Sequence, residues 1–228
     1  MGVYNTYIVL HNLCDFFKTK NLIHMKKHPI EIFSDWVTSG KDDGMEINHL
    51  ESVTNMLDYS LKDLENFNFI DAGCGTGWVV RMVSKMNLCN SACGVDGSKK
   101  MIEKAKSLDI NNQYFCSDLL TWKPKLKKDL VHSMEVLYYF KNPSIVLKNF
   151  YNNWLNDNGR LIIGIDFYKE NLSCHDWPDK TNVSIMNMMS ISEWIKMFEN
   201  CGFKNVKSWR TGQKKDWGGT LVVYGTKT

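Results

Sequence analysis

Short apolar stretches alternate with longer amphipathic segments through the middle of this 228-residue chain. Short apolar runs predict buried strands, and apolar positions that recur every three to four residues predict helices. The expected strands are residues 67–72, 91–95, 112–116, 129–133 and 161–166, and the helices between them are 78–86, 99–107 and 143–155. This alternation predicts βαβ units, and therefore an α/β fold with a parallel sheet.

The flanking segments follow other patterns. Helical spacing over residues 30–37 and 45–59 predicts two helices before the first strand, joined by a polar loop. Near the end, a helix over residues 191–201 has Ser190 as its cap and Gly202 as its stop. Two closely spaced strands, 203–209 and 220–224, predict an antiparallel pair. Residues 167–189 show little periodicity, and irregular segments of this length are usually functional, so we expect a lid there.

Composition narrows the class of protein. The formal net charge of +3 is too small and too scattered to indicate nucleic-acid binding. No apolar run is long enough to span a bilayer. The 7 cysteines include no C-x-x-C pair, which favours reduced thiols in a cytoplasmic protein. We expect one domain over residues 25–228, preceded by an extension (1–24, disordered or helical) whose first six residues fit a myristoylation pattern.

A glycine-rich turn follows the first strand of the expected sheet. Asp71 precedes Gly73, Gly75 and Gly77, in the spacing D-x-G-x-G-x-G, and the next helix starts at Trp78. Glycine allows a tight turn and close approach of a ligand to the backbone. Dinucleotide-binding proteins carry G-x-G-x-x-G instead, so this spacing disfavours a nicotinamide dehydrogenase.

Acidic residues end the following strands. Asp96 closes the second strand, 19 residues after Gly77, where a carboxylate can accept hydrogen bonds from both ribose hydroxyls. Asp118 closes the third strand, and Glu135 follows the fourth. Any one of these acids could be a simple turn cap. Their order along the chain favours a ligand site, because ligands of open α/β sheets bind at the carboxyl ends of the strands.

These motifs, together with the L-x-x-x-G-x-L turn over residues 155–161, resemble those of class I S-adenosylmethionine (SAM) methyltransferases. The similarity is to an uncharacterised subgroup related to ubiquinone/menaquinone methyltransferases. It implies a Rossmann-like, doubly wound and mostly parallel seven-stranded sheet, with an antiparallel C-terminal strand and helices on both faces. It also implies SAM as the cofactor. The expected cofactor-binding residues are Asp71, Gly73, Cys74, Gly75, Gly77, Trp78, Asp96, Gly97, Ser98, Met101, Asp118, Leu119 and Met134.

The acceptor side of the site is less standard. Glu46 and His49 are three residues apart, and therefore share a helix face. The candidates for catalysis are His49, Glu135, Tyr138 and His175, and the candidates for acceptor binding are Glu46, Tyr139, Tyr168, Asn171 and Trp177. Purely structural roles stay open for these residues. Glu46 and His49 could form an exposed helical pair, Tyr138 and Tyr139 could belong to the edge of the core, and Trp177 could anchor a loop. We expect an aromatic pocket for a small-molecule acceptor, no metal, and a monomer or homodimer.

Methyltransferases that act on other acceptors would share the cofactor-binding motifs described above. DNA amino-methyltransferases carry D/N-P-P-Y/F/W after the fourth strand, where this chain has residues 133–136 as S-M-E-V, and no Pro-Cys nucleophile follows either. We therefore expect no specific binding of nucleic acid. An RNA or protein methyltransferase, or a silent SAM-binding partner subunit, stays an alternative. Methylation of arsenite or a thiol is a minor one, with Cys174 in the expected lid as its candidate residue.

Overall fold

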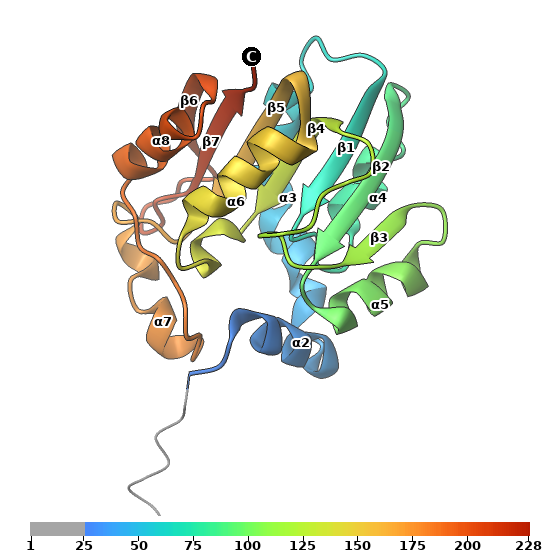
Figure 1. Ribbon diagram of the computed structural model, residues 1–228. Helices are drawn as coiled ribbons and strands as arrows, with labels where there is room; N and C mark the ends of the chain where they lie inside the picture. The colour runs from blue at the N-terminus through green and yellow to red at the C-terminus, as the bar shows by residue number, and fades with distance from the viewer. Residues whose placement is uncertain (1–25) are drawn as a thin grey trace, which may run out of the picture.

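A seven-stranded sheet in the order β3-β2-β1-β4-β5-β7-β6 forms the centre of the molecule (Figure 1). The computed structural model describes residues 26–228, so the expected N-terminal extension and its myristoylation pattern lie outside the described residues. β1 to β5 pair in parallel, and β7 is antiparallel to both β5 and β6. The predicted Rossmann-like sheet and the terminal antiparallel pair are thereby confirmed. The strands are β1 (Phe67–Ala72), β2 (Cys89–Asp96), β3 (Gln113–Cys116), β4 (Lys128–Met134), β5 (Leu155–Ile165), β6 (Lys204–Thr211) and β7 (Thr220–Thr226).

Helices cover both faces of the sheet. One apolar cluster joins the sheet to α3, α4 and α5, and the other joins it to α6 and α8. The helices are α2 (Pro29–Ser39), α3 (Met45–Ser60), α4 (Trp78–Val83), α5 (Lys99–Leu108), α6 (Pro143–Asn149), α7 (Trp177–Lys180) and α8 (Ile191–Asn200), with short helical turns η1 (Lys41–Gly44), η2 (Leu137–Tyr139), η3 (Phe150–Trp154) and η4 (Leu172–Cys174). Among residues 26–228, no helix is both long and apolar enough to cross a membrane.

Local sequence explains where several helices start. Ser190 caps α8 through a capping box with Glu193, as the sequence predicts for this residue. Asn142 caps α6 and Pro143 occupies its first turn. His28 caps α2 by accepting a hydrogen bond from the backbone N–H of Ile30 through its ring.

The region after α6 differs from the prediction of one helix over residues 143–155. The α-helix ends at Asn149 and continues as the π-helical turn η3, and β5 starts at Leu155 rather than at residue 161. Tertiary hydrogen bonds explain the difference: the side chains of Asn149 and Trp154 both donate to the carbonyl of Trp122. The expected turn before the strand lies inside β5, where Asn158 has a positive φ of 63°.

Two segments distant in sequence meet beyond the carboxyl ends of the strands. The backbone N–H of Lys27 donates to the carbonyl of Asn182 at 2.9 Å, and the N–H of Ser184 donates to the carbonyl of Lys27 at 2.8 Å. This isolated bridge joins the start of α2 to the segment after α7. In Figure 1 both helices lie below the carboxyl edge of the sheet, outside its two helical layers.

Candidate functional site

The glycine turn lies between β1 and α4, beside the point where the sheet order reverses between β1 and β4. The N–H of Gly73 donates to the carbonyl of Val95 at 2.7 Å. Gly73 has φ +76°, and a Cβ there would come within 2.2 Å of Val136. Gly77 has φ +78°, and a Cβ there would meet the ring of Tyr114 at 2.4 Å. Close packing therefore requires glycine at both positions.

Asp96 fixes this turn from the neighbouring strand. One of its carboxylate oxygens accepts a hydrogen bond from the N–H of Gly75 at 3.0 Å, and the other accepts one from the N–H of Ser98 at 2.7 Å. Burial raises the pKa of Asp96, while these two backbone N–H groups oppose the rise. A carboxylate held in this way presents its remaining lone pairs to the open space above the turn.

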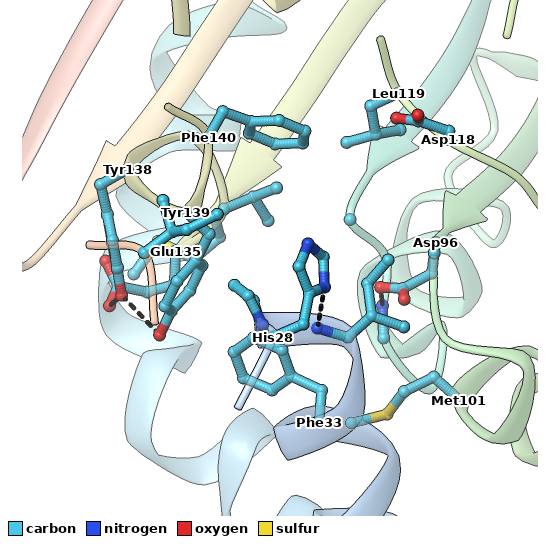
Figure 2. A pocket seen from close by; sticks show the side chains of 18 of the residues that line it. His28, Phe33, Asp96, Met101, Asp118, Leu119, Glu135, Tyr138, Tyr139 and Phe140 are labelled. Carbon is cyan, nitrogen blue, oxygen red and sulfur yellow. Dashed lines mark hydrogen bonds between the residues drawn. The ribbon is translucent and has the colours of Figure 1, made fainter. Parts of the chain in front are cut away.

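That space is a cavity of about 820 Å³. Figure 2 shows Asp96, Met101, Asp118 and Leu119 on one side, and Glu135, Tyr138 and Tyr139 opposite them. Of the residues expected to bind the cofactor, the cavity wall contains Gly73, Gly75, Asp96, Gly97, Met101, Asp118, Leu119 and Met134. Pockets for small ligands typically measure about 300–1,000 Å³, so the volume suits a large ligand with a second, smaller one.

A second hollow of about 30 Å³ lies behind the glycine turn. Asp71, Cys74 and Trp78 line it, together with His49 and Glu135. The ring of His132 holds Asp71, with Nδ1 2.8 Å from the carboxylate. The hollow has room for about one water molecule or one small polar group.

Two expected cofactor residues lie outside both spaces. The hydroxyl of Ser98 caps α5 by accepting from the N–H of Met101 at 3.3 Å, and it lies 2.8 Å from the hydroxyl of Ser34. Gly77 is used in packing against Tyr114. Local packing uses both residues, and their expected part in cofactor binding stays a prediction.

Aromatic rings form the opposite end of the cavity. Phe33 of α2 meets Trp36 edge-on, with ring centroids 5.2 Å apart, and meets Tyr139 of η2 in the same manner at 5.1 Å. Trp177 of α7 also lines the cavity, and it stacks on Phe167 and on Trp217. Three separate segments of the chain therefore converge on one apolar space.

Glu135 lies between the two ends. One of its carboxylate oxygens accepts from the hydroxyl of Tyr138 at 2.6 Å, and the other accepts from the N–H of Asp166 at 2.5 Å. Its φ of +59° is in the left-handed region, which is costly for a residue other than glycine. Strain of this kind accumulates at functional positions. Burial and then the Asp166 carboxylate raise the pKa of Glu135 well above its ordinary value, against the effect of the Tyr138 hydrogen bond.

His49 and Asp166 complete the polar group behind Glu135. The Nε2 atom of His49 lies 3.8 Å from the carboxylate of Asp166, and Nδ1 lies 2.8 Å from the carbonyl of Met45. Ligating atoms of His49, Glu135 and Asp166 all lie within 4.8 Å of one another. Both oxygens of Glu135 already accept hydrogen bonds, and we assign no metal to this group.

The segment over residues 167–189 only partly follows the expectation of an inward-facing lid. Trp177 lines the cavity, but Tyr168 and Asn171 are fully buried beneath it. Tyr168 donates to the carbonyl of Gly218 at 2.9 Å, and Asn171 donates to the carbonyl of Asp166 at 2.8 Å. Both therefore anchor the segment to the sheet and cannot reach an acceptor.

His175 and Cys174 also differ from their expected positions. His175 is exposed, and its ring Nε2 lies 3.0 Å from the carbonyl of Lys169. Cys174 is buried, and burial raises the pKa of its thiol to about 11. The structure thus removes His175 from the cavity and gives no support to Cys174 as a reactive thiol.

Glu46 is a further correction. It is exposed and does not line the cavity, whereas Met45 and His49 do. Residues one apart on a helix differ by about 100° in direction, so the pair four residues apart, Met45 and His49, defines the inward face. Helix α3 therefore contributes to the site as expected, but through Met45 and His49 and not through Glu46.

Sequence reasoning missed several cavity residues. His28, Ile30 and Phe33 come from the start of α2, and Phe140 follows η2. The amphipathic spacing over residues 30–37 could have suggested an apolar face at Phe33. No local pattern indicates that this face meets η2, because that contact depends on how α2 crosses the sheet edge.

A family model described as a methyltransferase domain matches residues 47–208. The chain therefore belongs to this family of methyltransferases, and its cofactor is S-adenosylmethionine. The glycine turn and the row of strand-end acids suit this cofactor, whose ribose and adenine need such partners.

Similar proteins support the same fold. Trans-aconitate 2-methyltransferase of Agrobacterium fabrum (strain C58) is 32% identical over 80 residues, which is 35% of this chain and 31% of that protein. A complex of the Haloferax volcanii methyltransferase activator Trm112 with a proposed methyltransferase gives a TM-score of 0.72 at 23% identity, covering 85% of this chain and 96% of the other. Magnesium protoporphyrin IX methyltransferase of Synechocystis PCC 6803 with bound S-adenosylhomocysteine (SAH) gives 0.66 at 17% identity, covering 87% and 99%.

Proposed function

We propose that this methyltransferase transfers a methyl group from SAM to a small-molecule acceptor enclosed in the aromatic end of its cavity. The observation that carries the proposal is the continuity of the cavity. One space of about 820 Å³ extends from Asp96 and Asp118 to Phe33, Tyr139 and Trp177. Such a space can hold donor and acceptor end to end, as an in-line displacement requires.

The cofactor half follows from the positions of the wall residues. Asp96 is proposed to accept hydrogen bonds from the ribose hydroxyls, and Asp118 with the neighbouring Leu119 is proposed to hold the adenine. Gly73 and Gly75 leave the room that the methionyl part needs, because they have no side chain. The cofactor supplies an activated methyl group on a sulfonium, and everything else in catalysis is left to positioning and proton transfer.

The acceptor half supports a small molecule rather than a nucleic acid or protein. Helix α2, turn η2 and helix α7 enclose it, and its wall is mostly apolar and aromatic. A flat or basic surface would suit a macromolecule better. Activity as a monomer or homodimer is part of the proposal. Reduced thiols would agree with the expected cytoplasmic location, and the described cysteines are free.

The test is a methyl-transfer assay with radiolabelled SAM and three fractions of a cell extract: small molecules, RNA and protein. We expect label in the small-molecule fraction and none above background in the other two. The Asp96→Ala variant is the control, since it should lose the transfer in every fraction. Label that accumulates in RNA or protein would contradict the proposal.

A further inference from the structure

The charged groups at the acceptor end are of two kinds. Lys141 and Lys180 line the mouth of the cavity, and both are exposed. Lys180 is already paired with Asp176 at 2.7 Å. The Glu135 carboxylate, in contrast, lies inside the cavity, next to the glycine turn. The acceptor end therefore holds a carboxyl group inside the cavity, whereas the lysine charges lie at the rim, where water screens them.

Aromatic faces surround the same space. Phe33, Trp36, Tyr139 and Trp177 come from three segments and line the cavity (Figure 2 shows Phe33 and Tyr139). The faces of aromatic rings carry partial negative charge and attract cations, most strongly when water is excluded. Rings and carboxylate together match one kind of ligand, a positively charged nitrogen with an apolar body.

We propose that the methyl acceptor is a basic amine, and that Glu135, through Tyr138 and Tyr139, removes the proton that its nitrogen must lose. This inference rests on the proposed function and adds the chemical class of the acceptor. The hydroxyl oxygens of Tyr138 and Tyr139 lie 3.2 Å apart. The hydroxyl of Tyr138 is placed to donate either to Glu135, at 2.6 Å, or to Tyr139. Because it has one hydrogen, donation to Glu135 leaves its oxygen free to accept the proton of Tyr139.

The reaction balances as follows. The bound ammonium passes a proton to the oxygen of Tyr139, whose own proton moves to Tyr138, and the proton of Tyr138 moves to Glu135. The lone pair left on nitrogen forms the new N–C bond to the methyl group of SAM. The C–S bond breaks, and its electron pair stays on sulfur, which leaves neutral SAH. The N-methylated ammonium departs, and the proton on Glu135 returns to solvent along the same route.

The surroundings of Glu135 suit a base for this task. Facing it are Asp166 from the end of β5, His49 from α3, and Tyr138 and Tyr139 from η2, with Cys174 of η4 nearby. Burial and Asp166 raise its pKa, which brings it nearer to that of an amine. A carboxyl group with an ordinary pKa of about 4.3 would be a poor base for an ammonium.

The alternative is an acceptor with a carboxylate group, because Lys141 and Lys180 could attract an anion to the cavity mouth.

Three probes of similar shape distinguish an amine acceptor from a carboxylate acceptor: phenethylamine, 2-phenylethanol and phenylacetate. Each is titrated calorimetrically, at neutral pH, into the full chain saturated with SAH. Binding of SAH to the wild-type protein is measured first. If SAH does not bind, the result contradicts the proposed function and not the choice of acceptor class.

We expect phenethylamine to bind about ten- to hundredfold more tightly than 2-phenylethanol, as for a hydrogen bond with a charged partner, and phenylacetate to bind most weakly. Glu135→Gln should abolish this preference while SAH affinity stays unchanged. Tyr138→Phe gives a second variant should Glu135→Gln fold poorly, and it should narrow the preference. His175→Ala is the control and should keep it. An amine that binds no more tightly than the alcohol, or a carboxylate that equals it, would overturn the inference.

Discussion

The two ends of the cavity are built in different ways. The cofactor end consists of strand ends and one turn, in which backbone geometry fixes Gly73, Gly75 and Asp96 through hydrogen bonds of the sheet and turn. The acceptor end consists of α2, η2 and α7, which are separated in sequence and meet only beyond the sheet edge. A shared fold therefore fixes the cofactor end, while the chain is free to vary the acceptor end.

This difference predicts which substitutions separate binding of the two ligands. Residues of the cofactor end should change affinity for SAH, whichever acceptor is present. Residues of the acceptor end should change turnover or acceptor affinity at constant SAH affinity. Glu135 lies at the junction, because it borders both the main cavity and the small hollow near Asp71.

The largest effect is expected for Glu135→Gln. Turnover of an amine acceptor should fall about 10²- to 10⁴-fold, the usual contribution of a general base. Affinity for SAH should change little, since the amide keeps the shape of the carboxylate. Rates measured beside calorimetric SAH binding would test this, and a parallel loss of both would place Glu135 in the cofactor end.

Asp96→Ala should have the next largest effect, on the opposite end. It removes the proposed ribose contacts and releases the N–H groups of Gly75 and Ser98. We expect SAH affinity to fall about ten- to hundredfold, from the loss of roughly 1.5–3 kcal/mol for bonds to a charged group. Calorimetry with Asp96→Asn as the milder variant checks it, and wild-type affinity in the alanine variant would refute the assignment.

Trp177→Ala is expected to act on the acceptor alone. Loss of one aromatic face is worth about 0.5–2 kcal/mol, which corresponds to a KM for an amine acceptor raised roughly two- to thirtyfold. The dissociation constant of SAH should stay constant. His175→Ala is the matched control from the same segment, and its exposed ring should change neither quantity. If the two substitutions changed the KM equally, Trp177 would not be distinguished from His175 as an acceptor-binding residue.

Stability should show a smaller effect at Glu135. Its pKa is raised in the folded protein, so ionisation destabilises the fold progressively as pH rises from about 4.3 towards that raised value. Glu135→Gln should therefore unfold at a higher temperature than the wild type at neutral pH, and the gap should vanish in acid. Thermal melts across pH test this, and a difference in melting temperature that does not depend on pH would contradict the charge effect.

The same contrast explains what could be predicted from sequence. Strand β1 and the turn after it follow from local rules, since glycine spacing and strand-end acids are properties of short segments. The positions of Asp96 and Asp118 follow from strand order alone. By contrast, Phe33 and Tyr139 meet through the crossing of α2 over the sheet edge, which short segments do not encode.

The errors have the same origin. Tyr168, Asn171 and His175 carry the chemistry of a binding site, but their polar atoms bond backbone carbonyls, those of Gly218, Asp166 and Lys169 respectively. Glu46 was misplaced because helical periodicity defines faces without indicating which residue is central to the contact. In each case the residue type was suitable, and tertiary packing determined whether it reached the cavity.

The central claim is that one cavity brings the cofactor and the acceptor together at Glu135. A crystal structure of the chain with SAH tests it most directly. The account predicts the ribose hydroxyls within hydrogen-bond distance of Asp96, the adenine beside Asp118 and Leu119, and the sulfur facing an open space between Glu135, Tyr139 and Phe33. A sulfur atom directed away from that space, or a ribose that does not reach Asp96, would contradict it.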